Sequence, residues 1–226
     1  MFYIPCMKNI PRIFIDQELS VGAVVSLPQE TLHYLQKVMR ANRFLAFNNG
    51  IEFECEISGK SAVVKGKTDH IDPSNDVALA FAPIRQSRME EMLNMATQMG
   101  VARLQPVMTD YTNAKYINWE RIRRIIIEAA EQSNRNSVPQ LLPEVLFDDF
   151  LKNTPNLIFA DERFAHGKSD NLSPITCHLS LLIGPEGGFS EREFAALDAA
   201  GTKSISLGKT VLRAETAAIA ALAKLC

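Results

Sequence analysis

The sequence has few cysteines and histidines, and neither residue type is clustered. The four cysteines, Cys6, Cys55, Cys177 and Cys226, are far apart and form no C-x-x-C pair, and the four histidines form no H-E-x-x-H motif. Zinc sites and disulfide frameworks depend on such spacings. We therefore expect reduced thiols and no metal site.

Long apolar runs are also missing. No stretch approaches the ~20 residues that a membrane helix needs. The N-terminal segment, MFYIPCMKNIPRIFI, contains early prolines and no clean apolar core before a cleavage site, which makes it a poor signal peptide. We expect a cytoplasmic protein that does not bind membranes.

The sequence also lacks an excess of basic residues. The chain has 24 Lys and Arg against 26 Asp and Glu, a net charge of −2. Dedicated nucleic-acid binders are usually basic, so any contact with RNA must come from a local patch. With 46% hydrophobic and 22% charged residues, the 226-residue chain has the composition of a globular protein with one large domain or two small ones.

Residues 1–72 predict a small β-barrel. Short apolar or alternating runs, broken by Gly, Asn and Pro, occur as PRIFI, AVVSL, RFLAFNNG, IEFECEI and SAVVKGK. Phe47–Gly50 predicts a hairpin turn, and apolar residues at helical spacing predict one helix over Gln29–Met39. The polar, proline-containing segment Asp72–Asp76 predicts a linker.

Residues 73–226 predict an α/β domain with a mostly parallel sheet, because strands alternate with helices. The expected strands lie in DVALAFAPI, RLQPVM, NLIFADE, HLSLLIG and KSISLG, and the expected helices cover Arg88–Met99, Asn118–Ser133, a segment after Ser190, and the chain from about Ala214.

The first candidate site is HLSLLIGPEGGFSEREF, residues 178–194. A strand leads into a glycine-rich turn, and Ser190 and Glu193 form an S-x-x-E capping box that starts a helix. Ligands of parallel sheets bind beyond the carboxyl ends of strands, and glycines permit close approach. A tight turn without a ligand is the alternative. A phosphate loop is disfavoured because this glycine-rich turn contains no G-K-[ST].

The second candidate site is SISLGKTVLRAETAAIAALA, residues 204–221. A strand ends at Gly208, and Arg213 and Glu215 precede an alanine-rich helix. The alternatives are a helix that simply packs closely and a solvated Arg–Glu pair.

Together, G-P-E-G-G-F-S and L-G-x-x-V-L-R-A-E-T-A resemble the paired signature of the SPOUT methyltransferases, and most closely the group that methylates N3 of a uridine in small-subunit ribosomal RNA. Upstream, P-R-I-F at Pro11–Phe14 and H-Y-L-Q-K-V-M-R at His33–Arg40 resemble that family's PUA-like RNA-binding barrel. Arg88–Glu90, Ala96–Val101 and Glu128–Pro139 resemble further family segments. The resemblance covers nearly the whole chain.

The resemblance implies a C-terminal sheet with a deep trefoil knot, a homodimer, and 16S rRNA of the small ribosomal subunit as substrate. It also implies S-adenosyl-L-methionine as cofactor, bound against the two glycine loops. The implied cofactor-binding residues are Leu182, Ile183, Gly184, Pro185, Glu186, Gly188, Leu207, Gly208, Leu212 and Thr216. We expect a side chain at Gly184 or Gly208 to block this site.

Arg213 and Glu215 are the implied catalytic residues. Uracil N3 is a poor nucleophile while it carries a proton, so a group must remove the proton or stabilise the anion. Arg213 stays protonated and suits the second role. Glu215 would be a base only with a raised pKa; alternatively it orients Arg213 or caps the last helix. The base is left open, and Glu186 is a further candidate.

The candidate RNA-binding residues are Arg12, His33, Lys37 and Arg40. Basic side chains on a PUA-like barrel can bind phosphates, and Lys37 and Arg40 have the spacing of one helical face. A solvated face is the alternative for each residue taken singly.

The chain departs from the family pattern at Met95, Gln98, Tyr111 and Asn134, where the family usually has lysine, glutamate, arginine and glycine. The first six residues resemble an extension, which makes Met7 an alternative start. Three other functions compete. One is a SPOUT enzyme that methylates ribose 2′-O or guanine N1, and another is a non-catalytic RNA-binding assembly factor. The third is a nucleotide hydrolase built on the first glycine loop, which lacks the lysine that it would need.

Overall fold

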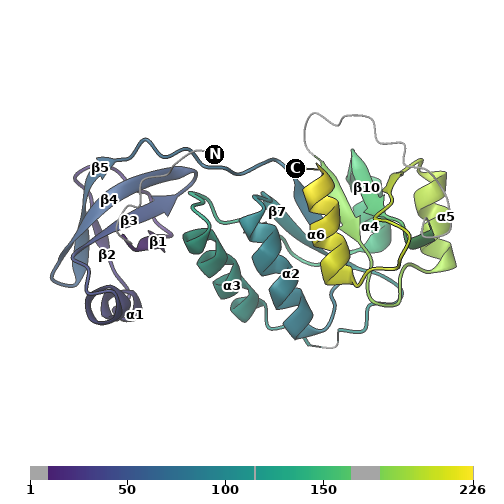
Figure 1. The fold of residues 1–226 in the computed structure, drawn as a ribbon, viewed down its shortest axis with the longest axis horizontal. Coiled ribbons are helices and arrows are strands. Elements are labelled where there is room, and N and C mark those ends of the chain that lie inside the picture. Colours follow the sequence, from purple (N-terminus) through teal and green to yellow (C-terminus); the bar gives the residue numbers. More distant parts are fainter. Residues whose placement is uncertain (1–9, 115, 164–178, 226) are drawn as a thin grey trace. The chain divides into compact units, whose positions relative to one another are not determined.

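The computed structural model describes residues 10–114, 116–163 and 179–225, which form two compact units (Figure 1). The first unit contains the chain up to Pro73 together with Ala130–Val138, and the second contains the other described residues. The division into domains at residues 1–72 and 73–226 stays a prediction. The alternative start at Met7 lies outside the described residues.

A five-stranded sheet forms the first unit. Its strands are β1 (Arg12–Phe14), β2 (Val24–Ser26), β3 (Arg43–Asn48), β4 (Ile51–Ser58) and β5 (Ser61–Lys67), in the order β1-β3-β4-β5-β2. The pairing of β1 with β3 is parallel and the other pairings are antiparallel. All five expected strands are present. Asn49 and Gly50 have φ of 50° and 78°, so the predicted hairpin turn between β3 and β4 is confirmed.

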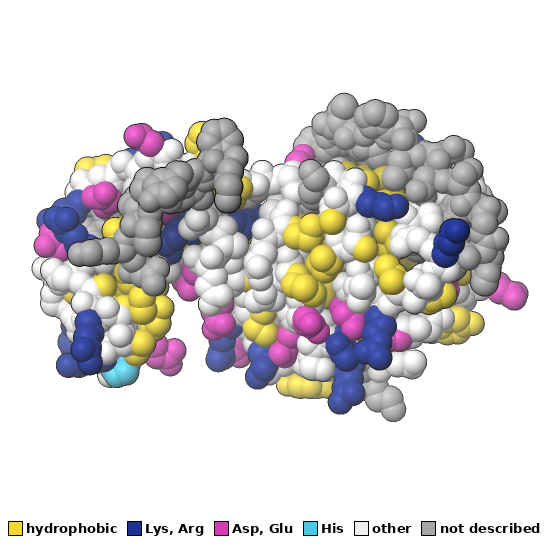
Figure 2. Space-filling view, viewed as in Figure 1, with side chains coloured by type: hydrophobic (Ala, Val, Ile, Leu, Met, Phe, Trp, Pro, Cys, Tyr) yellow, Lys and Arg dark blue, Asp and Glu magenta, His cyan; other side chains and the backbone are white. Residues whose placement is uncertain are grey.

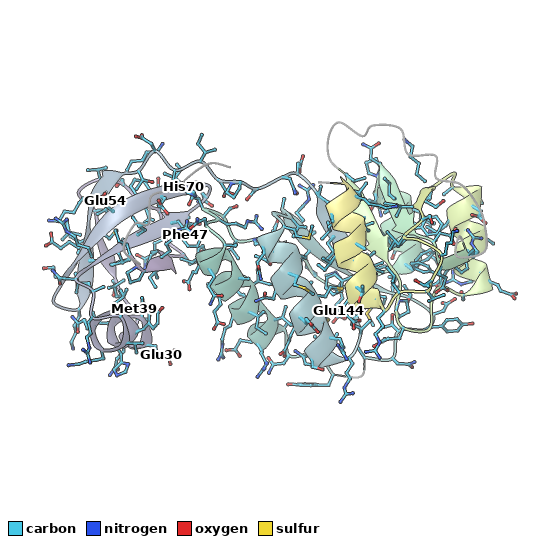
Figure 3. All side chains as sticks on the ribbon, viewed as in Figure 1. Glu30, Met39, Phe47, Glu54, His70 and Glu144 are labelled. Atoms are coloured by element: carbon cyan, nitrogen blue, oxygen red, sulfur yellow. The ribbon has the colours of Figure 1, made fainter. Side chains whose placement is uncertain are left out.

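The expected helix over Gln29–Met39 is different in detail. It consists of one α-helical turn, α1 (Gln29–His33), followed by a π-helix, η1 (Tyr34–Val38); Glu30 and Met39 are labelled in Figure 3. Arg40 follows with φ of 50°. The argument that Lys37 and Arg40 share one face of an α-helix is therefore wrong, because the α-helical repeat ends before both residues.

A seven-stranded parallel sheet forms the second unit, which confirms the predicted α/β class. The order is β12-β10-β11-β6-β7-β8, and β9 pairs with β7. The bounds are β6 Ala78–Phe81, β7 Arg103–Met108, β8 Gln140–Leu141, β9 Val145–Leu146, β10 Leu157–Ala160, β11 Ser180–Ile183 and β12 Lys203–Ile205. The sequence did not indicate β8 and β9, because two residues show no periodicity.

The other helices are α2 (Gln86–Gln98), α3 (Trp119–Gln132), α4 (Phe147–Asn153), α5 (Glu191–Ala199) and α6 (Ala214–Leu225). α4 contacts β7 and β9, and the last residues of α3 belong to the first unit. Leu182 of β11 packs in one cluster with residues of α4 and α5. Next to it, Ile183 lies on the opposite face of the strand, on the side where α6 contacts β10 and β11. Figure 1 shows α6 beside α2. No described helix is long and apolar enough to span a bilayer.

Candidate functional site

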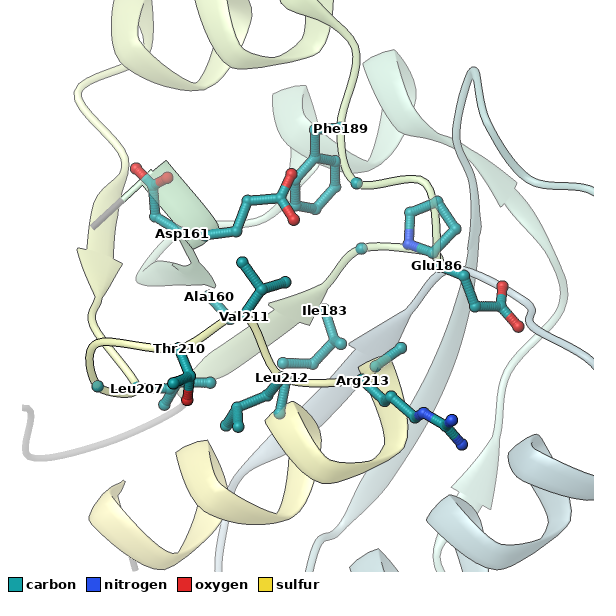
Figure 4. A pocket seen from close by; sticks show the side chains of 17 residues that line it. Ala160, Asp161, Ile183, Glu186, Phe189, Leu207, Thr210, Val211, Leu212 and Arg213 are labelled. Atoms are coloured by element: carbon teal, nitrogen blue, oxygen red, sulfur yellow. The ribbon is translucent and has the colours of Figure 1, made fainter. Parts of the chain in front are cut away.

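The two glycine loops meet in one pocket of about 240 Å³ (Figure 4). It lies at the carboxyl ends of the neighbouring strands β10, β11 and β12, the edge at which parallel sheets bind ligands. The first turn of α6 bounds it. The lining residues are Ala160, Asp161, Glu162, Ile183, Gly184, Pro185, Glu186, Gly188, Phe189, Leu207, Gly208, Thr210, Val211, Leu212, Arg213, Ala214 and Ala217.

Of the ten residues predicted to bind a cofactor, eight line the pocket, and Leu182 and Thr216 do not. Leu182 points to the other face of β11, into the core with α4 and α5, because successive side chains of a strand alternate. Thr216 is exposed on α6, whereas Ala214 and Ala217, three residues apart on the helix, border the pocket. The structure therefore does not bring these two side chains to the pocket, and the cofactor-binding roles of Leu182 and Thr216 stay predictions.

Three glycines of the pocket are required for different reasons. A Cβ atom at Gly184 would lie 3.1–3.3 Å from ring carbons of Phe189. Gly188 has φ of +72°, and its missing Cβ leaves space that the Glu162 carboxylate occupies. Gly208 has φ of +119°, with nothing within 4 Å of an added Cβ. A side chain at Gly208 would therefore strain the backbone. Because Gly208 lines the pocket, the expectation that such a side chain would also block the site stays a prediction.

The end of β7 anchors the first glycine loop. Ser190 caps α5 in the predicted capping box, and its Oγ also donates to Asp110 Oδ2 at 2.5 Å. The Asp110 backbone N–H donates to Glu193 Oε1 at 2.9 Å, and Arg192 donates to both Asp110 and Asp148. Hydrogen bonds from Arg192 and Ser190 lower the pKa of the Asp110 carboxyl group. The loop is thus held between β11 and this network.

We expect Ser190→Ala to lower the free energy of unfolding by about 1 kcal/mol, because it removes the N-cap acceptor of α5. Urea denaturation measures this loss. Ser87→Ala is the matched control, since Ser87 is exposed in the first turn of α2 but is not its N-cap. Equal, negligible effects of both changes would contradict the anchoring role of Ser190.

The structure separates the two candidate catalytic residues. Arg213 lines the pocket where the chain enters α6 (Figure 4). Glu215 does not line it: the residue is buried, and its Oε1 lies 3.4 Å from Nη1 of Arg88. Glu186 lines the pocket and accepts a hydrogen bond from the Arg85 backbone N–H at 3.3 Å. This geometry favours a structural role for Glu215 over a role as the base.

Sequence reasoning missed the contribution of β10. Ala160, Asp161 and Glu162 line the pocket where this strand ends. The sequence signal for this contribution was the acidic pair at the end of NLIFADE, because that strand lies next to the strand that leads into the first glycine loop. Asp161 is buried and its Oδ2 accepts from Arg163 Nη2 at 2.7 Å, so its role is structural. Phe189, Thr210, Val211, Ala214 and Ala217 were also missed, because only the folded loops bring them to the pocket.

Arg12 is a partly buried residue of the first unit, and its side chain is held by contacts within that unit. Its Nε donates to Glu52 Oε2 at 2.8 Å, and its Nη2 donates to Asn136 Oδ1 at 2.7 Å and to the Arg135 carbonyl at 2.9 Å. Its guanidinium also lies over the ring of Phe47, which is labelled in Figure 3. Because these contacts occupy the guanidinium, we correct the prediction that Arg12 binds phosphate.

The other candidate RNA-binding residues lie at the surface. His33, Lys37 and Arg40 are exposed on the segment that contains α1 and η1. Figure 2 shows basic side chains and a histidine gathered over this segment. The patch is local, as the overall charge balance requires.

Two of the four departures from the family pattern now have a structural context. Asn134 has φ of 60°, a left-handed conformation that asparagine tolerates better than most residues. Tyr111 lies against Gly187 of the first glycine loop. Met95 and Gln98 lie in and at the end of α2, away from the pocket lining. Among the described residues, no group of three or more His, Cys, Asp or Glu is arranged to hold a metal.

The fold and the pocket define an RNA methyltransferase: a family model described as RNA methyltransferase domain matches residues 72–226. The chain is 36% identical to the ribosomal RNA small subunit methyltransferase E of Rickettsia conorii, over 94% of this chain and 93% of that protein. The same-named protein of Synechocystis is 30% identical, over 95% and 76%. The chain therefore belongs to the ribosomal RNA small subunit methyltransferase E family.

Solved structures agree with this assignment. A ribosomal RNA small subunit methyltransferase E from Neisseria gonorrhoeae, bound to S-adenosyl methionine, matches with a TM-score of 0.82 and 28% identity, over 96% of this chain and 97% of that one. A putative methyltransferase from Legionella pneumophila, in complex with the same cofactor, matches with a TM-score of 0.84 and 28% identity over the same shares.

Proposed function

We propose that this chain transfers the methyl group of S-adenosyl-L-methionine to N3 of uridine 1498 in 16S rRNA of the small ribosomal subunit. The observation that carries the proposal is the single pocket lined by both glycine loops and by Arg213. The names of the relatives support the substrate, and the two cofactor-bound structures support the cofactor. An rRNA substrate also supports a cytoplasmic location.

The pocket residues fit this cofactor. Ile183, Leu207 and Leu212 give an apolar wall suited to an adenine ring, and the glycine loops present backbone donors and acceptors. The absence of a side chain at Gly184 and Gly188 keeps the loop open beside Phe189 and Glu162. When bound, the cofactor supplies an activated methyl group on a sulfonium. The protein supplies position and exclusion of water.

Arg213 is the proposed catalytic residue. Removal of the N3 proton places negative charge on the uracil ring and its O2 and O4 atoms, and a guanidinium at the pocket can donate hydrogen bonds to one of them. Glu215, paired with Arg88, serves to hold the start of α6 in this proposal. The residue that accepts the proton is left open, with Glu186 as a candidate in the lining.

Two finer features of the fold belong to the proposal. The sheet order places β10 between β11 and β12, and the segment after β12 passes the first glycine loop before α6 packs on β10 and β11. This arrangement supports the deep trefoil knot. The five-stranded, mostly antiparallel sheet of the first unit supports a PUA-like barrel that binds RNA.

Nucleoside analysis tests the function directly. We expect digested small-subunit rRNA from cells without the gene to lack N3-methyluridine, and the gene to restore it. Loss of a ribose-methylated nucleoside or of N1-methylguanosine would indicate another SPOUT specificity. Unchanged nucleosides together with a defect in subunit assembly would indicate a non-catalytic assembly factor.

RNA binding should depend on the exposed patch. We expect Lys37→Gln with Arg40→Gln to weaken binding of small-subunit rRNA and to reduce the slope of log affinity against log salt by about 1 for each lost phosphate contact. Filter binding at several salt concentrations measures both. Lys65→Gln is the control, because Lys65 is exposed in the same unit and pairs with Glu56. An unchanged salt slope in the double variant would remove the patch from the proposal.

The chain should form a homodimer. The support is the family resemblance, because most small residues of α6 are already buried within the chain, where α6 packs on α2, β10 and β11. We expect light scattering at micromolar concentration to give about twice the monomer mass of 25.1 kDa. The monomer mass at that concentration would contradict the dimer.

A further inference from the structure

Glu162 places a carboxylate in the pocket beside the first glycine loop. The residue follows β10 after Asp161, and it lines the pocket. Its Oε1 lies where a Cβ atom of residue 188 would be, so the glycine at that position makes room for this carboxylate. The side chain of Glu162 and the backbone of Gly188 are therefore in direct contact at the pocket wall.

The neighbouring acids have hydrogen-bond or ion-pair partners. Glu162 has none among the residues that the structure describes. Asp161 is paired with Arg163, and Glu186 accepts from the Arg85 backbone. Among the described residues, none donates a hydrogen bond to the Glu162 carboxylate or forms an ion pair with it. An ionised carboxylate is an acceptor only, with room for two or more donors. In this pocket those donors have to come from a ligand or from water.

The position of Glu162 in the sheet indicates which donors. β10 and β11 are adjacent and parallel, with Leu157 opposite Ser180. A glycine-rich turn follows β11, and an acid follows the neighbouring strand β10. Sheets that bind dinucleotides place a glycine-rich turn after one strand and an acid that accepts from the ribose hydroxyl groups beyond it. The cofactor proposed here carries the same ribose.

We propose that the carboxylate of Glu162 binds the ribose hydroxyl groups of S-adenosyl-L-methionine. The inference rests on the proposed function, because it takes the cofactor from there. It assigns Glu162 a binding role that the two glycine loops do not supply: a charged acceptor, which forms stronger hydrogen bonds than a neutral one. In this proposal Gly188 has two functions: it adopts the left-handed backbone of the turn, and it leaves room for the Glu162 carboxylate.

Calorimetry on the full chain tests this assignment with three ligands. S-adenosyl-L-methionine, S-adenosylhomocysteine and 5′-methylthioadenosine all contain the ribose, but only the first has a sulfonium and only the first two have the α-ammonium group. We expect Glu162→Gln to weaken all three by a similar factor, about 10-fold, and Glu162→Ala by about 10- to 100-fold. Glu191→Gln, an exposed residue of α5 outside the lining, should leave all three affinities unchanged.

The alternatives give different patterns. A loss confined to S-adenosyl-L-methionine would place Glu162 at the sulfonium, and a loss that spares 5′-methylthioadenosine would place it at the α-ammonium; either overturns the ribose assignment. Equal affinities in wild type and both Glu162 variants also overturn it. Thermal melting without ligand should be unchanged, which excludes a general loss of structure. If the wild-type chain binds none of the ligands, the proposed function fails instead.

Discussion

Replacement of Arg213 by alanine is expected to reduce the turnover number of rRNA methylation by about 100- to 1,000-fold, the range observed when one preorganised donor to a developing anion is lost. The affinity for S-adenosyl-L-methionine should change by only a few-fold. Tritium transfer to small subunits measures turnover, and calorimetry measures affinity. The distinction matters because a residue that merely shapes the pocket would change both quantities.

The expectation follows from where Arg213 lies. It lines the pocket at the start of α6 and is exposed, and in Figure 4 its side chain extends away from Ile183 and Val211 toward solvent. Its guanidinium can therefore be reached by a base that approaches the pocket from solvent. A guanidinium is a hydrogen-bond donor without acceptor capacity, so it can stabilise the uracil anion but is unsuited to remove the proton. Arg213→Lys keeps the charge but not the planar donor pair, and we expect it to recover only part of the activity.

Glu215→Gln should be mild in the same assay, because Glu215 is buried against Arg88 outside the pocket lining. Arg124→Ala is the matched arginine control, since Arg124 is exposed on α3, lies outside the pocket lining, and pairs with Glu120 one helical turn away. A steep loss for Glu215→Gln with a shifted pH–rate profile, beside a tolerant Arg213→Ala, would reverse the assignment of roles.

The features that the sequence predicted well are those encoded locally. The hairpin turn at Asn49 and Gly50 and the capping box of Ser190 and Glu193 each depend on residues a few positions apart. The parallel sheet followed from the alternation of strands with helices. For all of these, the chain itself supplies the neighbours that matter.

The features that were missed depend on distant partners. Arg12 appeared as a phosphate ligand because nothing near it in sequence shows that Glu52 and Asn136 surround it. Likewise, Asp110 precedes Ser190 by 80 residues, and only the fold brings them together. The change from α- to π-helix at Tyr34 has no local marker that we can identify.

The glycines of the two loops show how far sequence reasoning about the site could go. It identified Gly184 and Gly208 as essential and expected one mechanism, obstruction of the pocket. The structure supplies two mechanisms, close contact at Gly184 and backbone conformation at Gly208. Because the difference lies in φ and in contacts with Phe189, it is invisible in the glycine pattern itself.

We expect Gly184→Val to weaken binding of S-adenosyl-L-methionine by about 100-fold or more. Added methyl groups would press on Phe189, whose ring packs against Phe147, Phe159 and Phe194 with centroids 5.6–6.2 Å apart. Overpacking of this kind costs about 1–3 kcal/mol. To avoid that cost, the valine side chain would turn away from Phe189 into the space of the cofactor. A loss of about 2.8 kcal/mol of binding energy there corresponds to about 100-fold in affinity.

Gly208→Val should weaken the same binding through a different cause, a strained backbone at φ of +119° in the loop that forms the opposite wall. Gly201→Val is the matched control, because Gly201 has φ of +63°, has open space around it, and lies outside the pocket lining. It should lower thermal stability and leave cofactor affinity unchanged. Calorimetry and thermal melting of the three variants separate the cases. Near-normal affinity in both Gly184→Val and Gly208→Val would show that the cofactor binds elsewhere, whereas loss of affinity in Gly201→Val as well would show that strain alone, wherever it occurs, disables binding.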